Sequence, residues 1–357
     1  MSFSQYLSEQ LNTHPEMAPR DVFKLCYQAA RGAEHLLRDT TVAEGYFAAE
    51  WDKTAPRDGL PLAEPISDAY CRVNLAAWKA RGLPSEWLFR LFVKTASTPA
   101  EGDKLAEFLS DADALIHGSD TAFSLDEWER ALAEYRAVGT PAVHHSEDYR
   151  AAYTPAYRVV TRRLAGLIPV LEAIAAKKRD TAPLILAIDG RAAAGKSTLA
   201  MALADLLGAA TVHMDDFFLP PALRTEARLA EAGGNVHYER FREEVLPYLA
   251  VPEDFSYRVF DCGKMALDGE RAVANAPIRI VEGSYAHHPA LGNYAHVKVF
   301  CTVDADEQMA RILRRNGAAM AERFRREWIP MEEAYFSAYG IGENADAVFR
   351  LPLNITQ

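Results

Sequence analysis

The chain has 357 residues and a formal net charge of -11 at pH 7, and 49% of its residues are hydrophobic. This length predicts two globular domains, because one hydrophobic core rarely organises so many residues. The acidic balance argues against a general nucleic-acid or anionic-membrane surface, so neither nucleic acid nor a membrane is expected as a partner.

The cysteines and the N-terminal residues indicate in which cellular compartment the protein is expected. The four cysteines are widely scattered, without a CxxC pair or a histidine at zinc-ligand spacing, which favours reduced thiols and no disulfide. The first residues lack the cationic start and apolar stretch of a signal peptide, and no segment approaches the length of a membrane span. We therefore expect a soluble, cytoplasmic protein.

Residues 1–180 are expected to form an all-α N-terminal domain. In "DVFKLCYQAARGAEHLL" (21–37), apolar residues recur at spacings of three and four, which predicts one buried helix face. Stretches rich in proline and glycine separate further helical candidates at 41–53, 66–81, 84–97, 102–116, 125–138 and 155–177. The role of this half is open: it can pair subunits into a homo-oligomer, cover a nucleotide site or bind a second ligand.

The pattern changes near residue 180, where a domain boundary is expected. "LILAI" (184–188) is a short continuous apolar run, typical of a strand buried on both faces. Similar segments follow at 210–214, 278–283 and 297–303. Helical or irregular stretches separate them, so residues 181–357 are predicted to form an α/β domain with a doubly wound parallel sheet.

"AIDGRAAAGKST" (187–198) fits the phosphate-loop pattern G-x-x-x-x-G-K-[ST], between a buried strand and a helix. The backbone N–H groups of such a loop and the positive end of its helix bind nucleotide phosphates. Lys196 is expected to reach the β and γ phosphates of ATP, and the Ser197 hydroxyl is expected to bind Mg²⁺. The residues expected to hold the nucleotide are Gly190, Arg191, Ala192, Ala193, Ala194, Gly195, Lys196, Ser197 and Thr198.

Carboxylates follow two later strands, at the sheet edge where open α/β sheets bind ligands. Asp215 and Asp216 end the second strand, and one of them can orient or deprotonate a substrate hydroxyl, or hold Mg²⁺ through water. Glu282 ends the third strand and can serve as the metal partner of Ser197. The alternative for the two aspartates is a pair of solvated loop residues.

Arginines gather on a later helical stretch. Arg311 and Arg314 in "ARILRRNG" lie three residues apart, so they share nearly one helix face and can neutralise charge on a transferred phosphoryl group. The alternative is a solvated basic face, which is the usual meaning of a run of charges.

The C-terminal half resembles the uridine kinase-like group of P-loop kinases, which includes nucleoside kinases, phosphoribulokinase and bacterial pantothenate kinase. The resemblance covers about residues 183–350 and leaves the N-terminal half outside. The stretches that carry it, in the family's order, are "AIDGRAAAGKSTLA", "HMDDFF", "NVHYERFREEVLPYL", "YRVFD", "VEGSYA", "FCTVDADEQMARILRR" and "NADAVF".

The resemblance implies roles for individual residues. It implies that Asp215 is the general base that accepts the proton of the substrate hydroxyl. It also places Arg311 and Arg314 on the lid that closes over the phosphates. Where nucleoside kinases of the group usually carry an aspartate that binds the ribose hydroxyls, this chain has His237. The residues expected on the substrate side are Asp216, His237, Arg240 and Asp261.

The function predicted from these residues is transfer of the γ-phosphoryl group of ATP, with Mg²⁺, to a hydroxyl of a small molecule. His237 and Arg240 favour a carboxylate or phosphate on the acceptor, so nucleosides are expected to be poor acceptors. Two alternatives are open: a nucleotide-dependent switch or regulatory ATPase with the helical domain as its output, and a degenerate kinase that only binds nucleotide.

Overall fold

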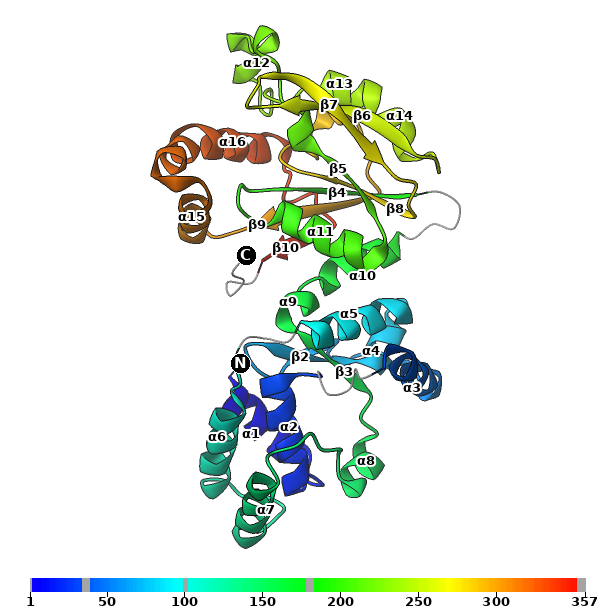
Figure 1. Cartoon of the computed structure of the whole chain (residues 1–357), viewed down its shortest axis with the longest axis vertical. Helices are drawn as coiled ribbons and strands as arrows, with labels where there is room; N and C mark the ends of the chain where they lie inside the picture. Colours follow the sequence, from blue (N-terminus) through cyan, green and yellow to red (C-terminus); the bar gives the residue numbers. More distant parts are fainter. Residues whose placement is uncertain (1, 34–38, 99–101, 178–182, 352–357) are drawn as a thin grey trace. The chain divides into compact units, whose positions relative to one another are not determined.

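The computed structural model describes residues 2–33, 39–98, 102–177 and 183–351. The chain divides into two compact units, Met1–Ala165 and Gly166–Gln357 (Figure 1). The boundary expected near residue 180 lies outside the described residues. Within the described ranges, no helix combines the length and the apolar character needed to cross a membrane.

The N-terminal unit is mainly helical, as the sequence predicts, and it also contains a small antiparallel sheet that was not predicted. Its helices are α1 (Phe3–Thr13), α2 (Pro19–Arg31), α3 (Thr40–Lys53), α4 (Leu75–Ala80), α5 (Ser85–Ser97), α6 (Leu105–His117), α7 (Leu125–Ala137), α8 (Glu147–Tyr153) and α9 (Arg162–Ala165). Its sheet has the order β1 (Ala63–Pro65), β2 (Tyr70–Asn74) and β3 (Tyr157–Thr161).

Two of the predicted helices, 66–81 and 155–177, each contain a strand of this sheet. Tyr70 to Val73 of β2 are all buried, so the strand shows no alternation of apolar and polar residues that would reveal it. A short buried strand and a buried helical turn look alike in sequence, and the pairing of β2 with β3 selects the strand here.

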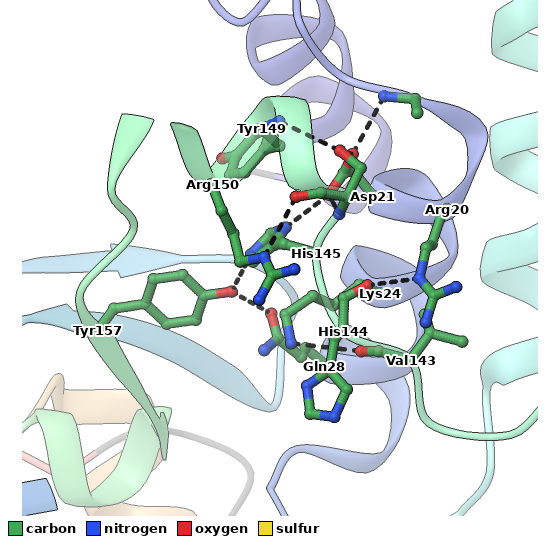
Figure 2. Close-up of polar contacts among 12 residues, drawn as sticks. Arg20, Asp21, Lys24, Gln28, Val143, His144, His145, Tyr149, Arg150 and Tyr157 are labelled. Atoms are coloured by element: carbon green, nitrogen blue, oxygen red, sulfur yellow. Dashed lines mark hydrogen bonds and ion pairs between the residues drawn. The ribbon is translucent and has the colours of Figure 1, made fainter. Parts of the chain in front are cut away.

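A buried polar network joins α2 to the segment before α8 (Figure 2). Asp21 on α2 accepts hydrogen bonds from His145 Nδ1 at 2.7 Å and from the Ser146 hydroxyl at 2.6 Å. His145 Nε2 lies 2.8 Å from the Tyr157 hydroxyl, and the imidazole stacks on the Tyr149 ring. Burial lowers the pKa of His145 to about 4, although the Asp21 carboxylate opposes this shift.

The C-terminal unit contains a five-stranded parallel sheet, which confirms the predicted fold class. The strand order is β10 (Ala347–Arg350), β9 (Val297–Thr302), β4 (Leu184–Gly190), β8 (Ile278–Glu282) and β5 (Ala210–His213). From β4 the chain first adds β5 and β8 on one side and then β9 and β10 on the other. The sheet is therefore doubly wound, and its ligand crevice is expected at the carboxyl end of β4.

Helices and a hairpin make up the rest of the C-terminal unit. The helices are α10 (Ile168–Ala176), α11 (Lys196–Leu207), α12 (Glu226–Ala230), α13 (Tyr238–Glu244), α14 (Leu246–Leu249), α15 (Ala305–Arg323) and α16 (Ile329–Tyr339). Helices α10 and α11 pack against the sheet. The β6 (Phe255–Asp261) and β7 (Ala266–Val273) strands form a separate antiparallel hairpin that was not predicted. All but the last residue of β7 are exposed, so this strand leaves no apolar run in the sequence.

Candidate active site

The phosphate loop leaves the buried strand β4 through a turn that only glycine permits. Gly190 has a φ of 137°, and a Cβ there would lie 2.0 Å from the carbonyl oxygen of Cys301 on the neighbouring strand. Gly195, with a φ of 92°, directly precedes α11. The loop therefore ends at a helix N-terminus, where backbone N–H groups lack intrahelical acceptors and can bind phosphate oxygens.

Lys196, the first residue of α11, folds back over the loop. Its ammonium group donates to the carbonyl oxygens of Gly190 at 2.7 Å and of Arg191 at 3.1 Å. These contacts hold the positive charge at the loop, where phosphate oxygens can replace the carbonyls. Contact of Lys196 with the β and γ phosphates stays a prediction of the sequence.

Ser197 and Glu282, the two residues predicted to bind the metal ion, are in contact. The Ser197 hydroxyl donates to Glu282 Oε2 at 3.0 Å, and the other oxygen of this buried carboxylate lies 2.6 Å from His213 Nδ1. Among the described residues, no group of three or more histidines, cysteines and acids could hold a metal ion. Mg²⁺ usually takes one or two protein oxygens and completes its shell with phosphates and water, so this pair fits a nucleotide-bound Mg²⁺.

The two aspartates after β5 have different surroundings. Asp215 is exposed to a cavity of about 1170 Å³ that extends from the phosphate loop. Desolvation by the surrounding walls, together with the neighbouring Glu282 and Asp216 charges, raises the pKa of Asp215, while Lys196 opposes the shift. Asp216 does not line this cavity, because its side chain is buried against the hairpin.

The cavity collects most of the residues predicted for phosphate binding. Its arginines are Arg224, Arg311, Arg314, Arg315 and Arg323. Arg311 donates to the Ala193 carbonyl at 3.2 Å and pairs with Glu307 at 2.8 Å, which places its charge against the phosphate loop. Arg314 is exposed on the same helix. Both predicted arginines therefore lie in one cavity with Lys196 and Asp215.

Three residues predicted on the substrate side make contacts within the fold instead. The His237 ring caps α13 by accepting from the Arg240 backbone N–H at 3.2 Å. Arg240 is buried, with its guanidinium 4.0 Å from the centre of the Phe217 ring and 2.6 Å from the Arg258 carbonyl. Asp261 closes the β6–β7 turn by accepting from Gly263 N–H at 2.7 Å.

Two further predicted residues also have partners in the fold. Asp216 accepts from the Tyr257 hydroxyl at 2.9 Å and pairs with Arg271 at 2.8 Å. The Arg191 side chain pairs with Glu333 at 2.6 Å and is absent from the cavity wall, so the loop contributes its backbone at this position.

Sequence reasoning missed several residues of the site. Glu332, on α16, accepts from Ala192 N–H in the loop and from the Ser284 hydroxyl, both at 2.8 Å. Burial raises the pKa of Glu332, and the Lys196 charge opposes this shift. Others lie on the cavity wall: Arg224, Asn235, Tyr285, Phe324 and Trp328. Only the tertiary fold brings these separate segments together, so no local motif indicates them.

Two of the solved structures that are similar to the chain are kinases by their titles. One is a "putative fructose transport system kinase" from Silicibacter sp. TM1040, 23% identical, covering 52% of this chain and 97% of its own, with a TM-score of 0.43. Another is a "possible uridine kinase" from Bacillus stearothermophilus, 19% identical, covering 48% of this chain and 90% of its own, with a TM-score of 0.38.

No protein-family model and no curated protein sequence matches the chain.

Proposed function

We propose that the chain is an ATP-dependent phosphotransferase that moves the γ-phosphoryl group to a hydroxyl of a small molecule. The observation that carries this proposal is the composition of one cavity. Lys196 and Ser197 lie on its wall at the phosphate loop, and the exposed Asp215 lies on the same wall after β5. A hydroxyl compound bound beside Asp215 would therefore share the cavity with the phosphates of ATP.

The proposed roles follow from the charges and contacts of these side chains. Lys196 would exchange its loop carbonyls for phosphate oxygens, and Arg311 and Arg314 would neutralise charge that develops during transfer. Mg²⁺ held by Ser197 and Glu282 would supply further charge neutralisation on the β and γ oxygens.

In the reaction, the acceptor oxygen bonds to the γ phosphorus as the bond from that phosphorus to the bridging β–γ oxygen breaks, and ADP leaves. The proton of the acceptor hydroxyl passes to the Asp215 carboxylate, whose raised pKa suits it to accept this proton. ATP and a small hydroxyl compound are thus the proposed partners. A cytoplasmic location stays a prediction of the sequence.

The first test is Lys196→Ala. Loss of a charge contact to the transferred group is expected to lower kcat/KM by about 3 kcal/mol or more in transition-state free energy, more than a hundredfold. ADP release with ATP and Mg²⁺, with and without a panel of hydroxyl compounds, measures the effect.

Lys177→Ala is the matched control, because Lys177 is exposed in the same unit and is absent from the cavity wall. Equal turnover by Lys196→Ala and the wild-type protein would contradict the proposed role of Lys196 in phosphoryl transfer. If the rate of ATP hydrolysis is the same with and without every added hydroxyl compound, the result would instead favour the nucleotide-dependent switch.

A further inference from the structure

The part of the cavity near Asp215 has a wall built by two segments that pair with each other. Leu219 N–H donates to the Asn235 carbonyl at 3.1 Å, and His237 N–H donates to the Phe217 carbonyl at 2.7 Å. This pairing places Asn235 on the cavity wall, and the loop between the two segments contributes Arg224. We call this part of the cavity, with Asp215, Arg224, Asn235 and Cys262, the acceptor end.

Arg224 presents a positive charge at the acceptor end. Its Nε donates to the Leu219 carbonyl at 2.8 Å, which orients the guanidinium and leaves the two terminal nitrogens for a ligand. No ion pair to Arg224 forms within the described ranges. The Cys262 thiol lies near both Arg224 and Asp215: burial and the Asp215 charge raise its pKa, and the Arg224 charge lowers it. Arg224, Asp215 and Cys262 all lie on the wall of this one cavity.

Asn235 presents an unpaired acceptor. Its Oδ1 atom is buried and has no hydrogen-bond donor among the described residues. The amide NH2 group of the same side chain donates to the Tyr285 hydroxyl, and both residues lie on the cavity wall. A buried acceptor without a donor is costly, so a ligand that brings a hydroxyl to this atom would remove the cost.

We propose that the phosphoryl acceptor is a small polyhydroxylated anion, an inference that rests on the proposed function. One hydroxyl lies at Asp215, a second donates to Asn235 Oδ1, and a carboxylate or phosphate group binds Arg224. A guanidinium can bind either anion through two parallel hydrogen bonds. A nucleoside has hydroxyls but no anion for Arg224. The sequence suggests His237 and Arg240 for binding this anion, but both side chains make contacts within the fold. We therefore assign anion binding to Arg224, which lies on the cavity wall.

The first experiment compares matched acceptors in the full chain with γ-labelled ATP and Mg²⁺. The pairs are glycerate and glycerol, gluconate and glucitol, and ribulose 5-phosphate and ribulose, with uridine as a neutral nucleoside. Labelled product is expected from anions, with kcat/KM at least tenfold above the neutral partner. The hydroxy acids and the sugar phosphate distinguish the two sources of negative charge.

Variants then assign the preference to residues. Arg224→Gln is expected to raise the KM for the anionic acceptor about 10- to 100-fold, the usual worth of a hydrogen bond to a charged group. The KM for ATP should change less than about twofold. Arg224→Lys keeps the charge and should recover part of the loss. Arg242→Gln, an exposed arginine absent from the cavity wall, is the matched control.

Asn235→Ala tests the second contact separately. It should weaken glycerate and leave 3-hydroxypropionate, which lacks the second hydroxyl, nearly unchanged. Equal or better turnover of the neutral partners would overturn the inference and leave the proposed function standing. So would an Arg224→Gln effect confined to the KM for ATP. ATP hydrolysis without labelled product from any compound would overturn the proposed function itself.

Discussion

Asp215 and Asp216 are neighbours in sequence, but their side chains face different surroundings. Asp215 is exposed to the cavity, whereas Asp216 is buried and bound by Tyr257 and Arg271 from the hairpin. Sequence alone places both at the carboxyl end of β5 and leaves their roles open. The hairpin separates them, because its contacts engage only Asp216.

Asparagine substitutions at the two positions should therefore have different effects. Asp215→Asn is expected to keep ATP affinity while kcat falls about a hundredfold to ten-thousandfold, the usual worth of a positioned base. Asp216→Asn removes the charge that pairs with Arg271, so it should lower the thermal stability of the C-terminal unit. Acceptor-dependent ADP release and calorimetric melting measure the two effects. A large loss of kcat in Asp216→Asn, without loss of stability, would identify Asp216 as the base.

The pH dependence of activity gives a second test of Asp215. Only the ionised carboxylate can accept the proton, so kcat/KM should rise with pH through the pKa of Asp215. Because desolvation and the neighbouring Glu282 and Asp216 raise this pKa, the acid limb should lie above the ordinary aspartate value of about 3.9. A profile measured at saturating Mg²⁺ should show this limb, and a limb at or below the ordinary value would contradict the role.

At the scale of elements, the network around Asp21 links α2 to the segment that begins α8 (Figure 2). Because burial lowers the pKa of His145 to about 4, the folded state holds this imidazole neutral between pH 4 and 6.5, while the unfolded chain protonates it. The folded state binds fewer protons in this range, so the stability from His145 is present above pH 6.5 and is lost as pH falls toward 4.

Between pH 7 and pH 5, this linkage is expected to remove about 2 kcal/mol from the free energy of unfolding. His145→Gln cannot titrate, so its stability should fall less over the same range. His144→Gln is the matched control, since His144 is exposed and lies next to His145 in sequence. Calorimetry of the full chain at both pH values compares the three proteins. The same pH dependence in His145→Gln and the unchanged protein would exclude His145 as the source.

Elements and site residues differ in how well the sequence predicts them. The inner strands β4, β8 and β9 are buried along their length, so each leaves a continuous apolar run. The exposed strand β7 leaves none. In the site, Lys196 and Ser197 belong to a contiguous motif, and Asp215 and Glu282 follow predicted strands.

Residues that reach the site only through tertiary contacts could not be predicted in this way. Glu332 lies 140 positions beyond Ala192, yet its carboxylate holds that residue's N–H. The predicted substrate roles of His237 and Arg240 rested on their charges alone. Their charges suggested substrate binding, but a helix cap and a buried guanidinium use the same groups.

At the scale of the whole molecule, the two units meet in sequence at Gly166, before α10. The sequence places the boundary near residue 180, because the apolar strand pattern begins only with β4. However, α10 packs against β9 and β10 and thus contributes to the C-terminal unit. Its buried side chains are Ile168, Val170, Leu171 and Ile174.

Two shortened chains test this division. A chain that starts at Gly166 is expected to fold by itself and bind ATP, because it keeps α10 and the complete sheet. A chain that starts at Pro183 lacks α10 and exposes apolar surface of β9 and β10. Each of the four buried side chains contributes about 1.5–3 kcal/mol, so this chain should lose several kcal/mol of stability or precipitate. Calorimetric melting with and without ATP compares the two. Equal melting temperatures would place α10 outside the folding unit, and failure of both chains would mean that the N-terminal unit completes the core of the C-terminal unit.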